Sequence, residues 1–178
     1  MKRFALVLCC CCALVSSVGA QSAASAANPG VAANRQVWSQ LSGFVLASAE
    51  QMPEADYAFA PVSGVRTFGQ IVGHVAGSQY AFCASALGET AKEDDTIEKT
   101  KTTKADLVAV MRASNEYCAK AYAQTDADAA KMVKMFGEDH TRMWALALNA
   151  SHDGEHYGNL ITYLRIKGMV PPSSRPTP

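Results

Sequence analysis

The sequence has no excess of positive charge, because 16 Lys and Arg residues stand against 16 Asp and Glu. Two of the basic residues, Lys2 and Arg3, belong to an N-terminal leader, and without them 14 basic residues face 16 acidic ones. A surface that binds nucleic acid needs a stripe of Lys and Arg to neutralise phosphates. The charge balance therefore argues against nucleic acid as a partner.

Long apolar runs are also missing. The apolar stretch from Phe4 to Val15 covers 12 residues, whereas a membrane-spanning helix needs about 20, and no later stretch replaces it. With Lys2 and Arg3 before it and the small residues Val18-Gly19-Ala20 after it, this stretch has the three parts of a secretory signal peptide. We expect residues 1–20 to be cleaved after Ala20, which leaves a periplasmic or secreted protein without a membrane span.

Cysteines are too few for a disulfide scaffold. Four of the six, Cys9 to Cys12, lie in the leader, so that only Cys83 and Cys118 remain in the mature chain. These two could pair in an oxidising compartment. Each also lies in an apolar helical pattern, which favours two buried thiols over a disulfide.

No stretch has the pattern of a convincing β-strand, and the apolar residues recur instead at helical spacing. Residues 21–33 are small and polar and predict a flexible tether, and residues 89–102 predict a charged, solvated loop. Gly88 and Gly168 are placed as helix stops, and Thr67 with Gln70 forms a capping box. The expected helices span residues 34–52, 67–87, 103–121 and 141–167.

These helices predict an all-α fold, a four-helix bundle formed by residues 34–172 and followed by a disordered tail over residues 173–178. About 158 residues remain after cleavage, a length that suits one domain. The link between the second and third helices is long enough to let these two helices run parallel.

His152 and His156 are four residues apart, so they lie one turn apart on nearly the same helix face. Ala145, Leu160 and Tyr163 share that face, which places two imidazoles on a stripe that should be buried. A chance pair of this kind is common, but His74 lies on the apolar face of another predicted helix. Three imidazoles directed at one interior fit the three-ligand, open-position arrangement of a divalent metal site.

The run from His152 to His156 also fits the inverted zinc-peptidase motif H-x-x-E-H, in which Glu155 would activate water. Such enzymes take a third, acidic ligand from well downstream. After His156 the chain has 22 residues, and none of them is Asp or Glu. This absence argues against a peptidase.

Two segments carry a resemblance to a known family. The first covers residues 61–82, above all the run from Arg66 to Ala76. The second covers residues 152–160, the run Tyr163-Leu164-Arg165, and Gly168 to Pro172. Together they resemble the DinB/YfiT-like family of metalloproteins, although Asn159 departs from the family pattern, in which glutamine is usual.

The resemblance implies a four-helix bundle with up-down-down-up topology and a three-histidine site that commonly carries nickel or zinc. Carried over to this sequence, the ligands are His74, His152 and His156. Characterised relatives include thiol-dependent transferases and isomerases that use cytosolic thiols. The export signal makes that particular activity less transferable to this chain.

The leading functional hypothesis is a metal-dependent hydrolase or transferase that acts on a small molecule. The alternatives are a non-catalytic periplasmic bundle that binds a metal or a small ligand, and a structural bundle with vestigial histidines. Glu155 and Asn149 are weak catalytic candidates that could orient water or a ligand ring. His140 precedes His152 by twelve residues, about 18 Å along a helix, and is not expected to share the ion. A homodimer is compatible with the sequence.

Overall fold

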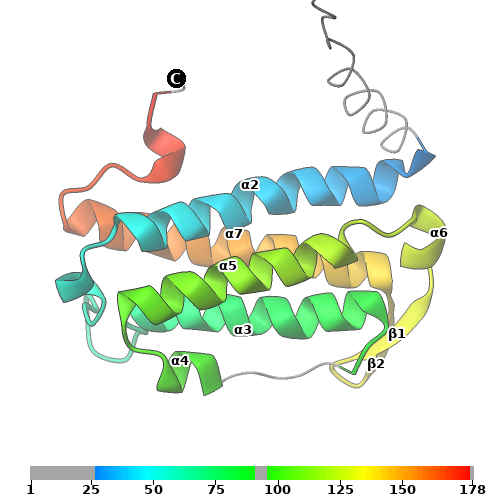
Figure 1. The fold of residues 1–178 in the computed structure, drawn as a ribbon, viewed down its shortest axis with the longest axis horizontal. Helices are drawn as coiled ribbons and strands as arrows, with labels where there is room; N and C mark the ends of the chain where they lie inside the picture. The colour runs from blue at the N-terminus through cyan, green and yellow to red at the C-terminus, as the bar shows by residue number, and fades with distance from the viewer. Residues whose placement is uncertain (1–26, 91–95, 177–178) are drawn as a thin grey trace, which may run out of the picture.

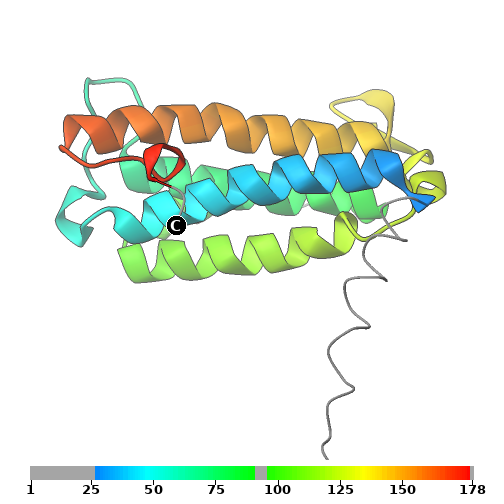
Figure 2. The ribbon, with the colours of Figure 1, turned by 90° about the horizontal axis from the view of Figure 1, so that it is seen from above.

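The computed structural model describes residues 27–90 and 96–176, and the fold is mostly helical. Four long helices lie side by side in both views of the ribbon (Figures 1 and 2). They are α2 (Pro29–Gln51), α3 (Phe68–Leu87), α5 (Lys104–Ala121) and α7 (Arg142–Ile166). Helix α3 packs against both α5 and α7, and α2 packs mainly against α7. The expected signal peptide lies outside the described residues.

Helix α2 begins at Pro29, five residues before the expected start at Asn34. A residue far along the sequence caps its first turn. The carboxylate of Asp126 accepts hydrogen bonds from the amides of Gly30 at 2.9 Å and Val31 at 2.8 Å. Asp126 starts the short helix α6 (Asp126–Ala129), so this cap exists only in the folded chain. The expected tether was therefore wrong over residues 29–33, which are helical.

The other helix ends match the sequence signals. Thr67 and Gln70 form the expected capping box, with Thr67 Oγ1 accepting from the Gln70 amide at 3.2 Å and Gln70 Oε1 accepting from the Thr67 amide at 2.8 Å. Gly88 and Gly168 adopt positive φ angles of 77° and 74°, which favour glycine directly after α3 and near the end of α7. The lengths of α3 and α7 are thus set by local chemistry.

The interior contains two apolar clusters. One includes Phe68, Val72 and Leu160, and the other includes Tyr122 and Leu146. Along α7, the segment 152–156 lies between the residues that α7 contributes to the two clusters. The expected metal-binding segment is therefore anchored on both sides by packed side chains.

A β-hairpin precedes α7, although no strand was expected. Strand β1 (Met132–Met135) pairs antiparallel with β2 (Glu138–Thr141). Phe136 and Gly137 form the two-residue turn, with φ angles of 53° and 85°. Both positive angles suit the turn types whose twist matches a hairpin. The strands were missed because each has four residues and neither alternates clearly between apolar and polar residues.

A short helix, α4 (Thr96–Thr100), lies within the segment that was expected to be a loop. Ile97 is 6% exposed and packs this helix against the domain. A Cβ atom on Gly73 of α3 would lie 2.8 Å from the Cα atom of Glu98, so only glycine lets the two helices approach this closely. Residues 91–95 are outside the described part of this segment.

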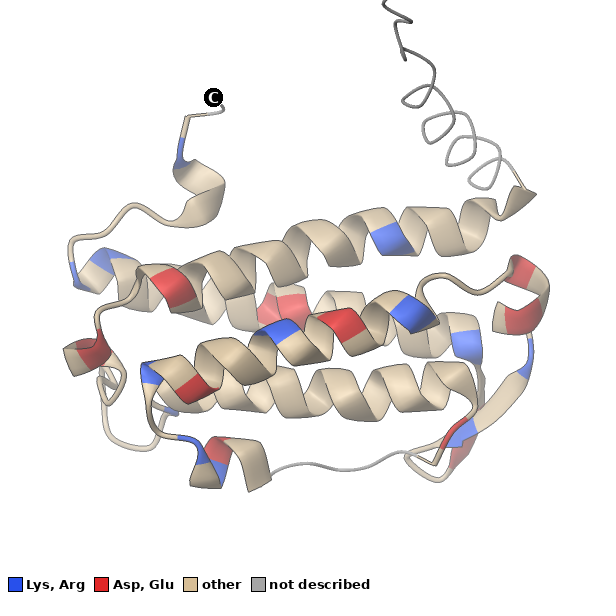
Figure 3. Cartoon of the chain, viewed as in Figure 1, with Lys and Arg blue, Asp and Glu red and all other residues tan. Residues whose placement is uncertain are grey.

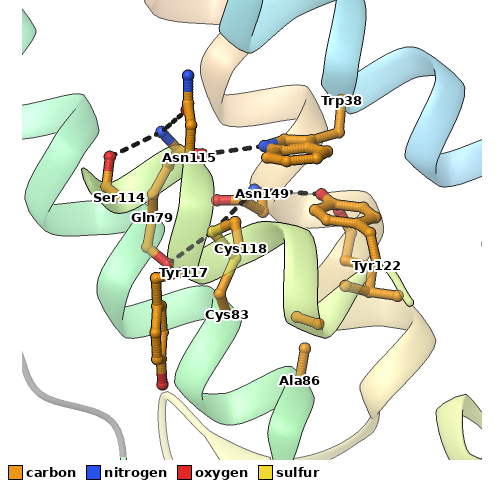
Figure 4. The surroundings of a disulfide bond; sticks show 12 residues. Trp38, Gln79, Cys83, Ala86, Ser114, Asn115, Tyr117, Cys118, Tyr122 and Asn149 are labelled. Atoms are coloured by element: carbon orange, nitrogen blue, oxygen red, sulfur yellow. Dashed lines mark hydrogen bonds between the residues drawn. A yellow bond between two sulfur atoms is a disulfide. The ribbon is translucent and has the colours of Figure 1, made fainter. Parts of the chain in front are cut away.

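Cys83 and Cys118 form a disulfide, so the expectation of two free thiols was wrong. Their Cα atoms are 5.2 Å apart, and the bond joins α3 to α5 (Figure 4). Both residues are fully buried, as expected. Helical periodicity correctly predicted their burial, but it could not show that the two faces oppose each other.

The C-terminal segment is ordered further than expected. A 3₁₀ turn, η2 (Pro172–Ser174), follows α7, and the Tyr157 hydroxyl donates to Ser173 Oγ at 2.7 Å. The expected disordered tail was therefore wrong at its start, because this hydroxyl fixes Ser173. Among the described helices, none combines the length and apolar character needed to cross a membrane.

Candidate metal centre

The three histidines converge, as the spacing predicted. His74 projects from α3, and His152 and His156 project one turn apart from α7, which packs against α3. The Nε2 atom of His152 lies 3.2 Å from Nε2 of His74 and 3.1 Å from Nε2 of His156. One nitrogen from each ring lies within 4.8 Å of the other two. The three rings could therefore hold a single ion.

The donor set fits a divalent transition metal. Three nitrogens held about 2.0 to 2.1 Å from one ion at tetrahedral angles would be about 3.4 Å apart. The measured separations of 3.1 and 3.2 Å are close to that value. Mutual N–H···N hydrogen bonds would give similar distances, so the partners of the opposite ring nitrogens have to decide between the two interpretations.

Those partners favour ligation. Nδ1 of His74 lies 3.2 Å from the carboxylate oxygen Oε2 of Glu98. A carboxylate accepts, so Nδ1 carries the proton and Nε2 presents its lone pair to the centre. The Asn159 nitrogen Nδ2 lies 3.3 Å from Nδ1 of His156, and with the two ends of the amide exchanged the oxygen Oδ1 would accept from that nitrogen in the same way. With the amide in that orientation, two lone pairs face the centre, more than the single Nε2–H of His152 can satisfy.

The protonation states of His152 and His156 also suit metal binding. Burial, and then the neighbouring His156 and His74, lower the pKa of His152 to about 3. Burial, and then His74, lower the pKa of His156 to about 4. Both imidazoles are therefore neutral at pH 7, and a neutral imidazole is the form that binds a metal.

A cavity of about 570 Å³ adjoins the centre on the side of His156. Its volume lies within the range of about 300 to 1,000 Å³ that small-molecule sites occupy. The lining comes from the loop before α3, from α3, α4 and α7: Pro61, Gly64, Val65, Arg66, Ile71, Glu98, His156, Asn159, Thr162 and Tyr163. A small molecule in this cavity would therefore lie against one of the three imidazoles.

Glu98 and Arg66 are site residues that sequence reasoning missed. Glu98 Oε2 accepts from Arg66 Nε at 3.0 Å and lies within reach of His74, and the Glu98 side chain is only 16% exposed. Glu98 lies in a charged, Thr-rich segment that predicts a solvated loop. The one sequence signal that bears on the position of Glu98 is Gly73, which directly precedes His74. This glycine lets α4 approach α3 closely.

The remaining candidates lie apart from the three rings. His140 is on β2, where its ring stacks on Trp144 with centroids 3.8 Å apart, and it is not part of the histidine group found among the described residues. Asn149 is fully buried and its Nδ2 donates to the Tyr122 hydroxyl at 3.1 Å. Glu155 is exposed on α7. Catalytic roles for Asn149 and Glu155 stay predictions.

The sequence profile of the DinB superfamily matches residues 35–160, and the chain belongs to this superfamily. That match begins within α2 and includes all three histidines. No curated protein sequence matches the chain.

Solved structures share the fold, among them two DinB-like proteins. A DinB-like protein from Bacillus cereus superposes with a TM-score of 0.68 at 17% identity, covering 78% of this chain and 93% of the other. A DinB-like protein from Bacillus subtilis gives a TM-score of 0.50 at 20% identity, covering 76% of this chain and 93% of the other. At these identities the likeness concerns the fold alone.

Proposed function

We propose that this DinB-superfamily protein is an exported metalloprotein that binds one divalent transition metal, zinc or nickel, through His74, His152 and His156. The observation that carries the proposal is the convergence of three Nε2 atoms, with Glu98 fixing the tautomer of the first ring. Imidazole suits both metals, so the donor set does not choose between them.

We also propose the up-down-down-up topology of a four-helix bundle. The directions of the helices in Figure 1 support it: α2 runs from right to left, α3 and α5 both run from left to right, and α7 returns from right to left. The parallel pair α3 and α5 is joined through the segment that contains α4. This order leaves α3 antiparallel to α7, the two helices that supply the ligands.

Export is proposed from residues 1–20, which have the pattern of a signal peptide. The disulfide between Cys83 and Cys118 supports this independently, because such bonds persist in oxidising compartments and are rare in the cytosol. The proposed location is the periplasm or the extracellular medium.

The proposed activity is that of a metal-dependent hydrolase or transferase acting on a small molecule. An ion bound by the three histidines would polarise a substrate oxygen or sulfur, or lower the pKa of water. The cavity beside His156 supports an enzyme over a storage protein, because it offers room for a substrate next to the ligands. The interspersed charges of the described residues (Figure 3) support a small molecule rather than nucleic acid as the partner.

Metal content tests this proposal. Elemental analysis of protein purified from its native compartment should give one zinc or nickel per chain. His74→Ala, His152→Ala and His156→Ala should each abolish stoichiometric binding, whereas His140→Ala, the control, should retain it. A wild-type protein without metal affinity, or equal loss from His140→Ala, would contradict the assignment.

Activity is tested separately, by screening esters, amides and thiol conjugates with the metal-loaded protein. Turnover that the three His→Ala variants lack would assign the enzyme. Stoichiometric metal binding without turnover of any compound in the screen would instead favour a non-catalytic periplasmic bundle that binds a metal or a small ligand.

A further inference from the structure

Arg66 lines the cavity and is held in place by contacts from two other elements. Its backbone carbonyl accepts from the Tyr163 hydroxyl of α7 at 2.6 Å, and its Nε donates to Glu98 of α4 at 3.0 Å. The next residue, Thr67, caps α3 and fixes the backbone on the other side. The guanidinium therefore has a defined position before any ligand arrives.

The far edge of this guanidinium is available to a ligand. Glu98 is bonded through Nε, and the Arg66 side chain remains 43% exposed while lining the cavity. Nη2 lies 3.4 Å from Nδ1 of His74. Once that nitrogen carries the proton that Glu98 accepts, it cannot accept from Arg66. Apart from this contact, neither Nη group has a hydrogen-bond acceptor among the described residues, since the Arg66 side chain is otherwise bonded only through Nε.

The rest of the cavity wall defines what Arg66 can select. Among the described residues that line the cavity it is the only Lys or Arg, and the others are apolar or neutral apart from Glu98. The single carboxylate of Glu98 is already used by Arg66 Nε and His74. The lining thus offers one cationic edge beside a largely uncharged surface and close to the histidines.

We propose that the cavity selects small molecules that carry a carboxylate, which the Nη groups of Arg66 bind as a fork while the reacting group faces the three histidines. This inference rests on the proposed metal-binding function and adds the substrate class. The planar guanidinium matches a carboxylate in two parallel hydrogen bonds. One cationic side chain matches a monoanionic carboxylate better than a doubly charged phosphate monoester.

Two hydroxamates that differ only at the far end test the proposal. Succinohydroxamate and butyrohydroxamate carry the same metal-chelating group, but only the first ends in a carboxylate. We expect zinc-loaded protein to bind succinohydroxamate about tenfold more tightly, the ratio expected from one charge-assisted pair at a partly exposed site. Isothermal titration calorimetry measures both dissociation constants.

Variants assign the effect to the guanidinium. Arg66→Gln should reduce the ratio to about one, and Arg66→Lys should restore part of it, because a point charge replaces the fork. Arg112→Gln is the matched control, since Arg112 is another exposed Arg paired with a Glu but lies on α5. Its ratio should equal that of the wild type.

The outcomes separate this proposal from the one on which it rests. Equal affinity of the wild type for both hydroxamates would overturn carboxylate selection while leaving the metal site intact. A ratio that persists in Arg66→Gln, in protein that still binds one zinc per chain, would also overturn it. If the wild-type protein binds no zinc and neither hydroxamate, the metal proposal fails and this inference fails with it.

Discussion

Glu98 is the residue on which the orientation of His74 depends. Its carboxylate oxygen lies 3.2 Å from Nδ1 of the ring and 3.0 Å from Nε of Arg66. A carboxylate behind a ligating imidazole fixes the tautomer and raises the basicity of the nitrogen that binds the metal. Three ligands alone would leave His74 free to rotate, whereas Glu98 and the packing of α4 restrict it.

We predict that Glu98→Gln weakens zinc affinity by about tenfold, the lower end of the effect of such partners. The glutamine oxygen can still accept from Nδ1, but without the negative charge. Competition with a zinc chelator measures the affinity, and the absorption spectrum of the cobalt-substituted protein reports the ligand field. Glu89→Gln serves as control, because Glu89 also accepts a hydrogen bond, from Tyr117. Unchanged zinc affinity and cobalt spectrum in Glu98→Gln would show that Glu98 does not position His74.

Asp153 is buried on α7 between His152 and His156 in sequence but takes no part in the arrangement described above. It is 0% exposed, and neither carboxylate oxygen has a hydrogen-bond partner in the described part of the protein. Burial raises the pKa of this carboxyl well above its usual value. The folded state therefore favours the protonated form, whereas the unfolded chain ionises near its ordinary pKa.

This difference makes Asp153 a pH-dependent cost to stability. The pKa of Asp153 is higher in the folded state than in the unfolded state. Its contribution to stability is therefore fully present below the unfolded-state pKa and is lost as pH rises toward the folded-state pKa. We predict that Asp153→Asn raises the thermal midpoint of the metal-free protein at pH 7. The pKa values of His152 and His156 are lowered instead, so these two residues reduce the stability of the folded state as pH falls.

The wild-type protein and Asp153→Asn share those histidines, so the difference between their thermal midpoints isolates Asp153. That difference should be smallest near pH 4 and should grow toward pH 7, as differential scanning calorimetry in the presence of a chelator would show. A difference that does not change with pH would mean that the carboxyl has the same pKa in the folded and unfolded states.

At the scale of elements, the contact between α3 and α4 connects one glycine to the proposed metal site. An added Cβ on Gly73 would meet the backbone of α4 at 2.8 Å, and backbone cannot move aside as a flexible side chain can. Displacing α4 would withdraw Glu98 from His74 without altering any ligand.

We predict that Gly73→Ala lowers zinc affinity at least as much as Glu98→Gln and also lowers the thermal midpoint. Gly43→Ala on α2 is the matched control, because nothing lies within 4 Å of its added Cβ. That change should instead stabilise the protein by about 0.5 to 1 kcal/mol, since alanine favours a helix over glycine. Chelator competition and thermal unfolding of both variants provide the test. Zinc affinity of Gly73→Ala equal to that of Gly43→Ala would contradict the proposed link between α4 and the site.

The elements also show which features the sequence could predict. The ends of α3 and α7 follow from local caps, and the four-residue spacing of His152 and His156 fixes their shared face. The early start of α2 depends on Asp126, which lies 96 residues from Gly30. Contacts of this separation leave no periodic signal, so local reasoning could not find the cap.

The same limit explains what was missed at the candidate site. The three proposed ligands could be predicted because imidazoles on an apolar helical stripe conflict with burial unless they have partners. Glu98 and Arg66 lie in segments where charge is ordinary. Their role emerges only when α4 packs on α3 and brings the carboxylate to His74.

At the scale of the whole molecule, the disulfide joins α3 to α5, two of the four long helices. Cys83 and Cys118 are 35 residues apart in sequence. Closing a loop of this length removes conformational entropy from the unfolded chain, which by the chain-entropy model stabilises the fold by about 4 kcal/mol. Other contacts hold α3 against α7, the pair that carries the histidines.

We therefore predict that Cys83→Ala with Cys118→Ala lowers the free energy of unfolding by about 3 to 4 kcal/mol but preserves the zinc stoichiometry. Urea unfolding of the oxidised wild type and of the double variant measures the first quantity, and zinc titration below the unfolding transition measures the second. The urea midpoint of the wild type should fall when dithiothreitol is added, whereas that of the double variant, which has no bond to reduce, should not move.

Thiol titration links the disulfide to the proposed export. Protein purified without reductant from the periplasm or medium, then denatured, should have no free thiol, since the leader cysteines leave with residues 1–20. Protein lacking the leader and made in a reducing cytoplasm should have two free thiols and the lower urea midpoint of the reduced form. Two free thiols in exported protein would show that Cys83 and Cys118 remain the buried thiols that their helical pattern suggests, and the stability attributed to the bond would then have to come from packing between α3 and α5.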